Sequence, residues 1–85
     1  MEARTQVLIL LDDVLGLHGR EQEFTDQTLL LGALPELDSM AVVSILSAIE
    51  ERFGVTIDDD EVDGSIFATL GSLLEFVERK LHQGS

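Results

Sequence analysis

The segment LPELDSMAVVSILSAIEERFG, residues 34–54, decides how the middle of this sequence folds. Pro35 disfavours helix at the residue before it and keeps the chain extended as far as Asp38. From there onward apolar side chains recur at the spacing of one helix face, and Gly54 is a residue type that commonly ends helices. The spacing predicts a helix over residues 39–53 with a buried stripe made of Val42, Val43, Leu46, Ile49 and Phe53.

Helical periodicity also occurs on both sides of this segment. Apolar residues at helical spacing predict a first helix over residues 4–16. After the central helix, a short helix is expected over residues 64–68, and Thr69 is the expected N-cap of a last helix over residues 70–82. No run of alternating polarity is long enough to predict a paired strand. We therefore predict a single all-α domain over residues 1–85, a bundle of three main helices plus one short helix.

The last predicted helix is amphipathic. Arg79 and Lys80 fall in its final turn, where positive charge is favourable near the negative end of the helix dipole. Its apolar face would pack against the stripes of the other two main helices. The members of this predicted face are Leu70, Leu73, Leu74, Val77 and Leu81.

Acidic residues dominate the charge of the chain. It contains 17 Asp and Glu against 5 Lys and Arg, a formal net charge of −12 at pH 7. Such a surface repels nucleic acid and anionic membranes and attracts basic protein surfaces. The longest apolar run near the N-terminus, Val7 to Leu11, is too short for a signal peptide or a membrane span. We expect a cytoplasmic monomer without nucleic-acid binding or membrane insertion, and the lack of cysteine fits a reducing compartment.

Ser39 stands at the start of the central helix without a base near it in the sequence. A serine nucleophile needs a positioned base, and the G-x-S-x-G pattern of serine hydrolases is absent. The two histidines, His18 and His82, lie in a polar loop and near the C-terminus. We therefore expect no catalytic activity. Asp38 is the expected N-cap of the helix, because its side chain can accept a bond from an N–H of the first turn.

The acidic segment after the central helix invites comparison with a calcium site. Asp59, Glu61, Asp63 and Gly64 occupy the first, third, fifth and sixth positions of an EF-hand loop. The last position, which requires a bidentate glutamate, is Leu70. We therefore predict no metal site. An acidic adaptor bundle that binds a basic helix or divalent ions, with the serine unmodified, is the alternative from a different functional class.

Taken in order, these segments resemble the acyl carrier protein family. The resemblance runs from about Leu29 to Leu81 and centres on LDSM (37–40), where the family typically shows Asp-Ser-Leu. It continues through AIEERFGVTI (48–57) and DDDEVDGSIFATLGSLLEFV (58–77). These stretches match the family's second helix, acidic loop and final helix in order and length. The resemblance implies the same helical bundle.

The resemblance also implies a role for Ser39. In the family, a phosphopantetheinyl transferase attaches 4'-phosphopantetheine from coenzyme A to this serine, and the arm's terminal thiol holds an acyl group as a thioester. Asp38 would be the acidic neighbour that the transferase recognises. The other partners would be acyl-transferring or acyl-ligating enzymes with basic docking surfaces. The residues expected to contact partners are Met40, Val43, Glu50, Glu51, Asp59, Asp60 and Glu61.

Departures from the family's pattern bear on cargo and partners. Ala41 and Ser44 stand where the family's second helix is often acidic, which suggests a different partner set from that of fatty acid synthesis. GALPELDSM, together with the acidic segment, is similar to a subgroup that accompanies exosortase and exopolysaccharide gene sets. D-alanyl and peptidyl carriers share the bundle and the modified serine, so they remain alternatives. An acyl chain is expected to enter the space beneath the central helix, lined by Val43, Leu46 and Leu73.

Overall fold

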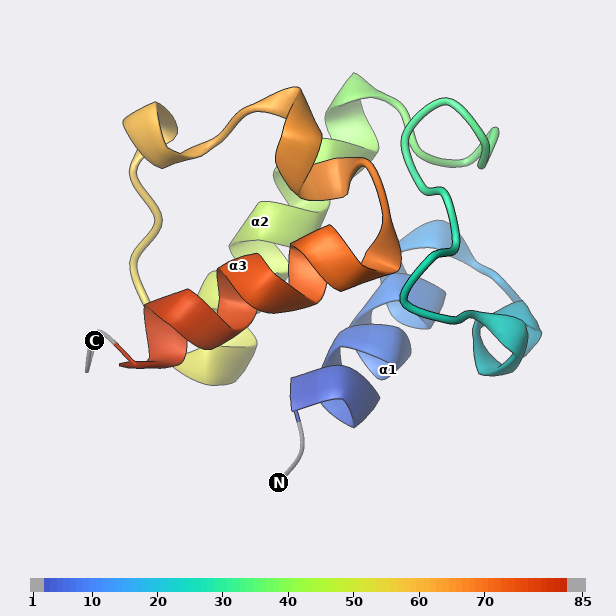
Figure 1. The fold of residues 1–85 in the computed structure, drawn as a ribbon, viewed down its shortest axis with the longest axis horizontal. Coiled ribbons are helices and arrows are strands. Elements are labelled where there is room, and N and C mark those ends of the chain that lie inside the picture. Colours follow the sequence, from blue (N-terminus) through green and yellow to red (C-terminus); the bar gives the residue numbers. More distant parts are fainter. Residues whose placement is uncertain (1–2, 83–85) are drawn as a thin grey trace.

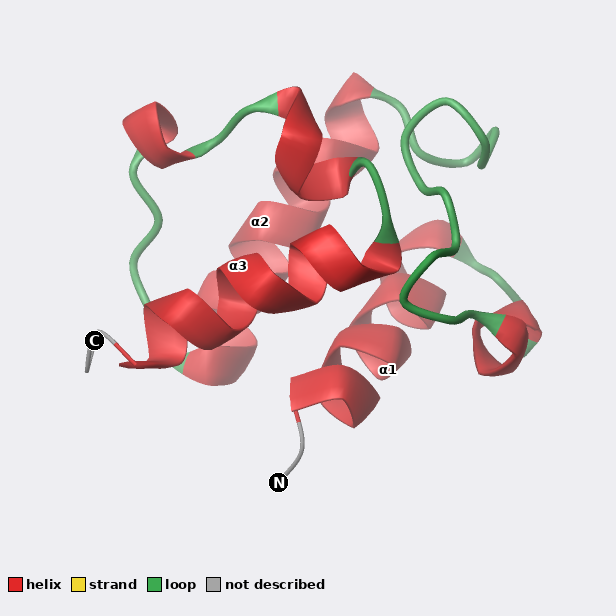
Figure 2. Ribbon diagram, viewed as in Figure 1, coloured by secondary structure: helices red, strands yellow, loops and turns green. Residues whose placement is uncertain are grey.

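The computed structural model describes residues 3–82, and within that range it contains three α-helices and three 3-10 turns (Figures 1 and 2). One isolated antiparallel bridge, between Leu29 and Thr69, is the only β pairing in the described residues. The α-helices are α1 (Ala3–Leu15), α2 (Ser39–Phe53) and α3 (Leu70–His82). The 3-10 turns are η1 (Arg20–Glu23), η2 (Asp59–Glu61) and η3 (Gly64–Phe67).

The predicted all-α fold is confirmed. The helices expected over residues 39–53 and 70–82 coincide with α2 and α3, and the one expected over 4–16 lies one residue later than α1 at both ends. The short helix expected over 64–68 is the 3-10 turn η3, which ends at Phe67. The turns η1 and η2 were not predicted, because each is a single polar turn without an apolar repeat.

Helix α1 is the centre of the packing, because it contacts both α2 and α3 as well as η1. The core is aliphatic apart from two phenylalanines, Phe67 and Phe76. Burying such side chains contributes roughly 1.5–3 kcal/mol each, so this cluster is the main stabilising term. The fully buried aliphatic members are Val7, Leu11, Leu17, Leu30, Ile45, Ile49, Leu70, Leu73 and Val77.

The buried face of α2 differs from the predicted one. Val43 was placed in the stripe, but its side chain is 59% exposed, and Ile45 is fully buried instead. Val42, Leu46 and Phe53 are only partly buried against the core. Ile45 lies four residues before Ile49, which is the spacing of one helix face, whereas Val43 lies on the opposite side. The correct phase was therefore present in the sequence.

The prediction for the buried face of α3 was wrong by one residue at the C-terminal end of the helix. Leu81 is 40% exposed, whereas Lys80 is 5% exposed. Lys80 follows Val77 by three residues, so its hydrocarbon stem continues the apolar face of the helix. Its ammonium group is paired with Glu61, as described below, rather than exposed at the helix end.

The long connection between α1 and α2 is tied to the start of α3 by backbone hydrogen bonds. The N–H groups of Leu30 and Leu31 donate to the carbonyls of Ala68 (3.1 Å) and Phe67 (2.9 Å). The N–H of Leu70 donates to the carbonyl of Thr28 (2.9 Å). Leu30 is fully buried, so this segment is anchored by its side chain as well. The connection therefore reaches α2 from a fixed position.

Candidate functional site

Asp38 and Ser39 form the start of α2. The backbone of Asp38 is extended, with φ −112° and ψ −173°, and its Oδ1 accepts the N–H of Ala41 at 2.8 Å. This is an N-cap, which satisfies one of the free N–H groups of the first turn. Gly54 ends the helix in the left-handed region, with φ 66°. The predicted N-cap at Asp38 is confirmed, and Ser39 is the first residue of the helix.

The hydroxyl of Ser39 is exposed and has no hydrogen-bond partner within residues 3–82. No histidine or lysine lines the space beside it. His18 lies in the exposed connection after α1. A serine without a base cannot be activated from within the chain. It remains available to a group delivered from outside.

A cavity of about 520 Å³ opens beside Ser39. The first turns of α2 form one side of it, and the segment from Val62 to Phe67 forms the other. Its apolar lining comes from different parts of the chain, brought together by the backbone pairing of the long connection with Phe67 and Ala68. The lining residues are Leu31, Asp38, Ser39, Val42, Val62, Asp63, Gly64 and Phe67.

This cavity is not lined by the residues predicted for an acyl chain. Val43 is largely exposed, and Leu73 is fully buried within the core. Leu46 is partly buried and does not line the cavity either. Sequence reasoning placed an acyl-chain space directly beneath α2, whereas this cavity lies between the start of α2 and the segment before α3. The segment 62–67 has no strong periodicity, so nothing local in the sequence signalled its contribution.

Two of the predicted partner-binding residues form an apolar surface next to Ser39. Met40 is 74% exposed and Val43 is 59% exposed. They are three residues apart on α2 and therefore share a face. Between Ser39 and Glu50 the helix carries no charged residue. The part of α2 that follows the serine is thus uncharged as far as Glu50.

The predicted acidic partner residues fall into two groups. Glu51, Asp59 and Asp60 are exposed. Glu50, in contrast, accepts the backbone N–H of Ile57 at 2.7 Å through its Oε2. It therefore fixes the chain after α2. Glu61 is also used within the fold.

Glu61 forms an ion pair with the buried Lys80. Lys80 Nζ donates to Oε1 at 2.9 Å and to Oε2 at 3.0 Å, and the N–H of Asp58 also donates to this carboxylate at 2.9 Å. The Asp58 N–H and then the Lys80 ammonium lower the pKa of Glu61 below its ordinary value of 4.5. The carboxylate is thus satisfied internally. The prediction that Glu61 is a docking charge is not supported by this geometry.

The rest of the acidic segment has a local structural role or faces solvent. Asp63 Oδ1 accepts the N–H of Ser65 at 2.8 Å and caps η3, and its bonds to the Ser65 side chain and backbone lower its pKa below the usual 3.8. Within residues 3–82, no three His, Cys, Asp or Glu side chains group as metal ligands.

Each of the five Lys and Arg side chains contacts another group of the chain. Arg4 pairs with Asp26, Arg20 with Glu36, Arg52 with Asp13 at 3.9 Å, and Lys80 with Glu61. Arg79 lies 5.9 Å from the centroid of the Phe76 ring. The large excess of acidic groups is therefore presented to solvent without neutralisation. No helix in the described residues is both long and apolar enough to cross a bilayer.

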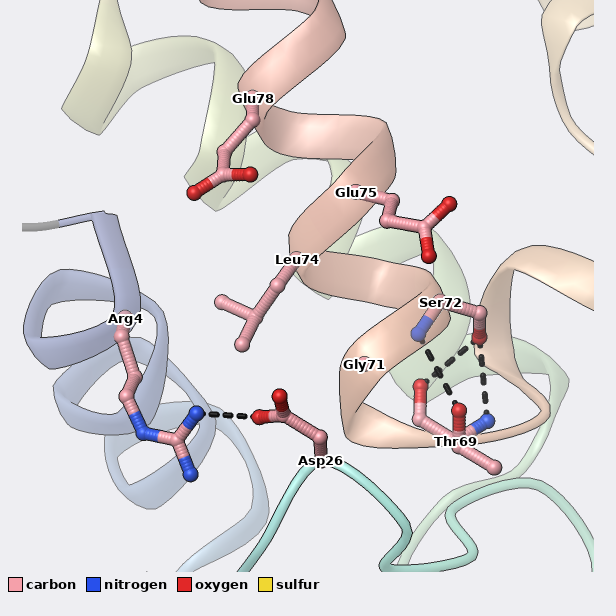
Figure 3. Close-up of a pocket in the computed structure, with 8 residues that line it drawn as sticks. All are labelled: Arg4, Asp26, Thr69, Gly71, Ser72, Leu74, Glu75 and Glu78. Atoms are coloured by element: carbon pink, nitrogen blue, oxygen red, sulfur yellow. Dashed lines mark hydrogen bonds and ion pairs between the residues drawn. The ribbon is translucent and has the colours of Figure 1, made fainter.

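A second hollow, of about 560 Å³, lies between α1, the long connection and α3 (Figure 3). It contains none of the predicted site residues. Thr69 and Ser72 cap the start of α3 reciprocally, each N–H donating to the other's hydroxyl at 3.1 Å. The N–H of Gly71 donates to the Asp26 carbonyl, and a Cβ at Gly71 would lie 2.8 Å from that oxygen. At this hollow the backbone of α3 contacts the long connection so closely that position 71 requires glycine.

The comparisons with known proteins agree with this geometry. Residues 6–77 match the family of domains described as the phosphopantetheine attachment site. The chain belongs to the acyl carrier protein family. The predicted family, and with it the predicted phosphopantetheine cofactor, is confirmed.

Two individual acyl carrier proteins are similar to this one. The solution structure of a holo acyl carrier protein from Nitrosomonas europaea is similar with a TM-score of 0.88 and 49% identity, over 96% of this chain and 99% of that chain. An acyl carrier protein from Acidothermus cellulolyticus is 35% identical over 57 residues, which are 67% of this chain and 57% of the relative. The matched segment thus spans a little over half of that relative's length.

Proposed function

We propose that this acyl carrier protein bears 4'-phosphopantetheine on Ser39, carries acyl groups on that arm, and delivers them to partner enzymes in the cytoplasm without catalysing a reaction itself. The observation that carries the proposal is the exposed hydroxyl of Ser39, which begins α2, lacks a base and borders a cavity. When bound, the arm supplies a terminal thiol that holds the acyl group as a thioester. The chain's own residues position this group and present it.

The surroundings of Ser39 fit such an arm. A phosphodiester on Oγ would lie at the positive end of the α2 dipole, where negative charge is stabilised. The neighbouring cavity of about 520 Å³ offers apolar walls from Leu31, Val42, Val62 and Phe67 to the uncharged part of the arm or its cargo. No buried charge has to be displaced, because the acidic groups at the cavity, Asp38 and Asp63, are both exposed.

The attachment reaction follows from these positions. The Oγ of Ser39 forms a bond to the phosphorus that carries pantetheine in coenzyme A, and the pyrophosphate bond breaks so that adenosine bisphosphate leaves. The proton of the hydroxyl goes to a base on the transferase, since the chain offers none. Asp38 holds the first turn through its bond to Ala41 and presents a carboxylate to the transferase.

Partner enzymes dock on the surface around the serine. Met40 and Val43 supply apolar contact next to the reacting group. The exposed Glu51, Asp59 and Asp60 attract basic surfaces over a longer range. Glu50 and Glu61 contribute indirectly, by fixing the backbone of the acidic segment.

An acyl carrier protein is favoured over a D-alanyl or peptidyl carrier protein, because both similar proteins named above are called acyl carrier proteins. An acidic adaptor with an unmodified serine has no comparable support, since it gives no reason for the match to the phosphopantetheine attachment family. The association with exopolysaccharide gene sets stays a prediction from the sequence.

Intact-mass spectrometry tests the proposal. Wild type, Ser39→Ala and Ser44→Ala are incubated with coenzyme A, magnesium and a promiscuous phosphopantetheinyl transferase. Wild type and Ser44→Ala should gain one arm, and Ser39→Ala should gain none. Ser44 is a matched control because it is an exposed serine on the same helix. An arm on Ser39→Ala, or no arm on wild type, contradicts the proposal.

A further inference from the structure

The segment between Val55 and Ile66 has little apolar anchoring. Both of those residues are buried, but no side chain between them is fully buried. Figure 1 shows η2 at the edge of the molecule, joined to η3 by an extended connection. Stretches with few buried apolar contacts open locally at low cost. The position of this segment must therefore depend on polar contacts.

Two carboxylates connect this segment to the main helices. Glu50 on α2 accepts the N–H of Ile57. Glu61 pairs with Lys80 on α3 through both of its oxygens, and it also accepts the N–H of Asp58. Because the side chains of Lys80 and Glu61 are only 7% and 29% exposed, water competes with their attraction less than at an open surface. The Glu61–Lys80 pair is thus the contact that fixes the far part of the segment to α3.

The same segment forms one wall of the Ser39 cavity. Val62, Asp63 and Gly64 follow directly after Glu61 and line the cavity across from Ser39 and Val42. At the other end of this wall, Phe67 is buried in the core. The wall is therefore fixed at one end by apolar burial and at the other by the Glu61–Lys80 pair.

We propose that Lys80 and Glu61 are positioning residues for the Ser39 cavity. Their ion pair fixes the wall at residues 62–64 and thereby sets how well the cavity shields an acyl chain on the arm. This role rests on the function proposed above. It also gives a reason for the presence of a lysine on the buried face of α3.

Hydrogen exchange of the unmodified protein tests the first half of the proposal. Lys80→Met retains the length and apolar stem of the side chain but removes its charge. Glu61→Gln retains the shape of the side chain but removes the negative charge that pairs with Lys80. Both should speed exchange of the hydrogen-bonded amides of Asp58, residue 61 and Val62 by about tenfold, while amides of Leu10 and Leu11 in α1 stay protected. The matched controls are Arg79→Met, the neighbouring cation on α3, and Glu78→Gln, an exposed acid on the same helix.

Thioester lifetime tests the second half. Each variant is loaded by the transferase from acetyl or octanoyl coenzyme A, and release of the acyl group by hydroxylamine is followed by intact mass. Octanoyl release should be several-fold faster in Lys80→Met and Glu61→Gln than in wild type and the controls. Acetyl release should be the same in all, because two carbons are too short to be shielded by the wall.

The outcomes separate this proposal from the proposed function. If wild type gains no arm, the carrier function and the shielding role both fail, while the exchange data still decide whether the pair fixes the wall. If the arm is attached but octanoyl release is equal in all variants, only the shielding role is wrong. If exchange is unchanged in both variants, or rises equally in α1, the pair does not act locally on the wall and the proposal is overturned.

Discussion

The start of α2 and the acidic segment at residues 58–63 were both predicted to recognise partners, but the structure uses them differently. Next to Ser39, the apolar side chains of Met40 and Val43 are exposed. In the acidic segment, Glu61 is paired with a buried lysine. Apolar side chains are usually buried and charged side chains usually exposed, and these residues show the opposite. The comparison teaches that residue type alone does not separate a docking surface from a structural contact.

The largest expected effect on the free energy of unfolding tests which face of α2 is exposed to solvent. Ile45→Ala removes a fully buried side chain, so it should lower the free energy of unfolding by about 2–5 kcal/mol. Val43→Ala removes a largely exposed one and should change it by less than about 0.5 kcal/mol. Urea denaturation of both variants measures the difference. Equal losses would show that Val43 belongs to the core, as the sequence first suggested.

Much of the fold was predictable because helix ends and apolar periods are local signals. Asp38 and Gly54 mark α2 to the residue, and Thr69 marks the start of α3. The exact phase of each buried face was less predictable, since Val43 is as apolar as the buried Ile45 and Leu81 is more apolar than the buried Lys80. Spacing from Ile49 favours Ile45, which precedes it by four residues, but Lys80 and Leu81 follow Val77 by three and four residues and both fit its face.

The start of α2 at Ser39 was predictable, but the cavity beside it was not. The serine and its cap are adjacent in sequence, and the resemblance to the family marks them. The cavity residues Leu31, Val62 and Phe67 come from segments without a period and meet only through tertiary packing. The pairing of Glu61 with Lys80 joins residues 19 positions apart. No local pattern predicts which of several acids such a lysine meets.

A smaller effect on the free energy of unfolding distinguishes two adjacent residues at the N-terminus of α2. Asp38→Ala should lower the free energy of unfolding by about 1 kcal/mol, because the bond to the Ala41 N–H is lost. Ser39→Ala should change it by less than about 0.5 kcal/mol, because the hydroxyl is exposed and alanine favours helix. Arm attachment should show the opposite order: Ser39→Ala abolishes it, and Asp38→Ala only slows it. Denaturant melts and the intact-mass assay together measure both orders; a more damaging Ser39→Ala in the melts would contradict the N-cap assignment.

Stability should depend on pH through the carboxylates that are hydrogen-bonded or ion-paired within the fold, rather than through the exposed acids. The pKa of Glu61 is lowered in the folded protein by the Asp58 N–H and by Lys80. A lowered pKa stabilises the fold above the unfolded-state value, and that stabilisation is lost as the pH falls through the folded-state value. In wild type the melting temperature should therefore fall below about pH 4.5, with Asp63 and Glu36 contributing in the same direction.

The variant Glu61→Gln measures how much of this pH dependence comes from the Glu61 carboxylate. The variant should melt below wild type near neutral pH, and the two curves should converge as the solution is acidified, because wild type then loses the same ion pair. Asp60→Asn, which removes an exposed charge on the same turn, should keep the pH dependence of wild type. A constant gap between Glu61→Gln and wild type at every pH would mean that the charge of Glu61 does not stabilise the fold.

The smallest expected effect concerns the exposed acids that remain after the internal pairs are formed. Four of the five basic residues are in ion pairs, so repulsion among exposed groups such as Asp59 and Asp60 is not relieved locally. Raising ionic strength from 0.01 to 0.15 M shortens the Debye length from about 30 Å to about 8 Å, which screens this repulsion. The melting temperature of wild type should rise by a few degrees, and the rise should be smaller in an Asp59→Asn, Asp60→Asn double variant. The Glu61–Lys80 pair is partly shielded from solvent, so Glu61→Gln should respond to salt much as wild type does. A melting temperature that is flat over this range, or one that falls, would show that exposed acid repulsion is not a destabilising term in this fold.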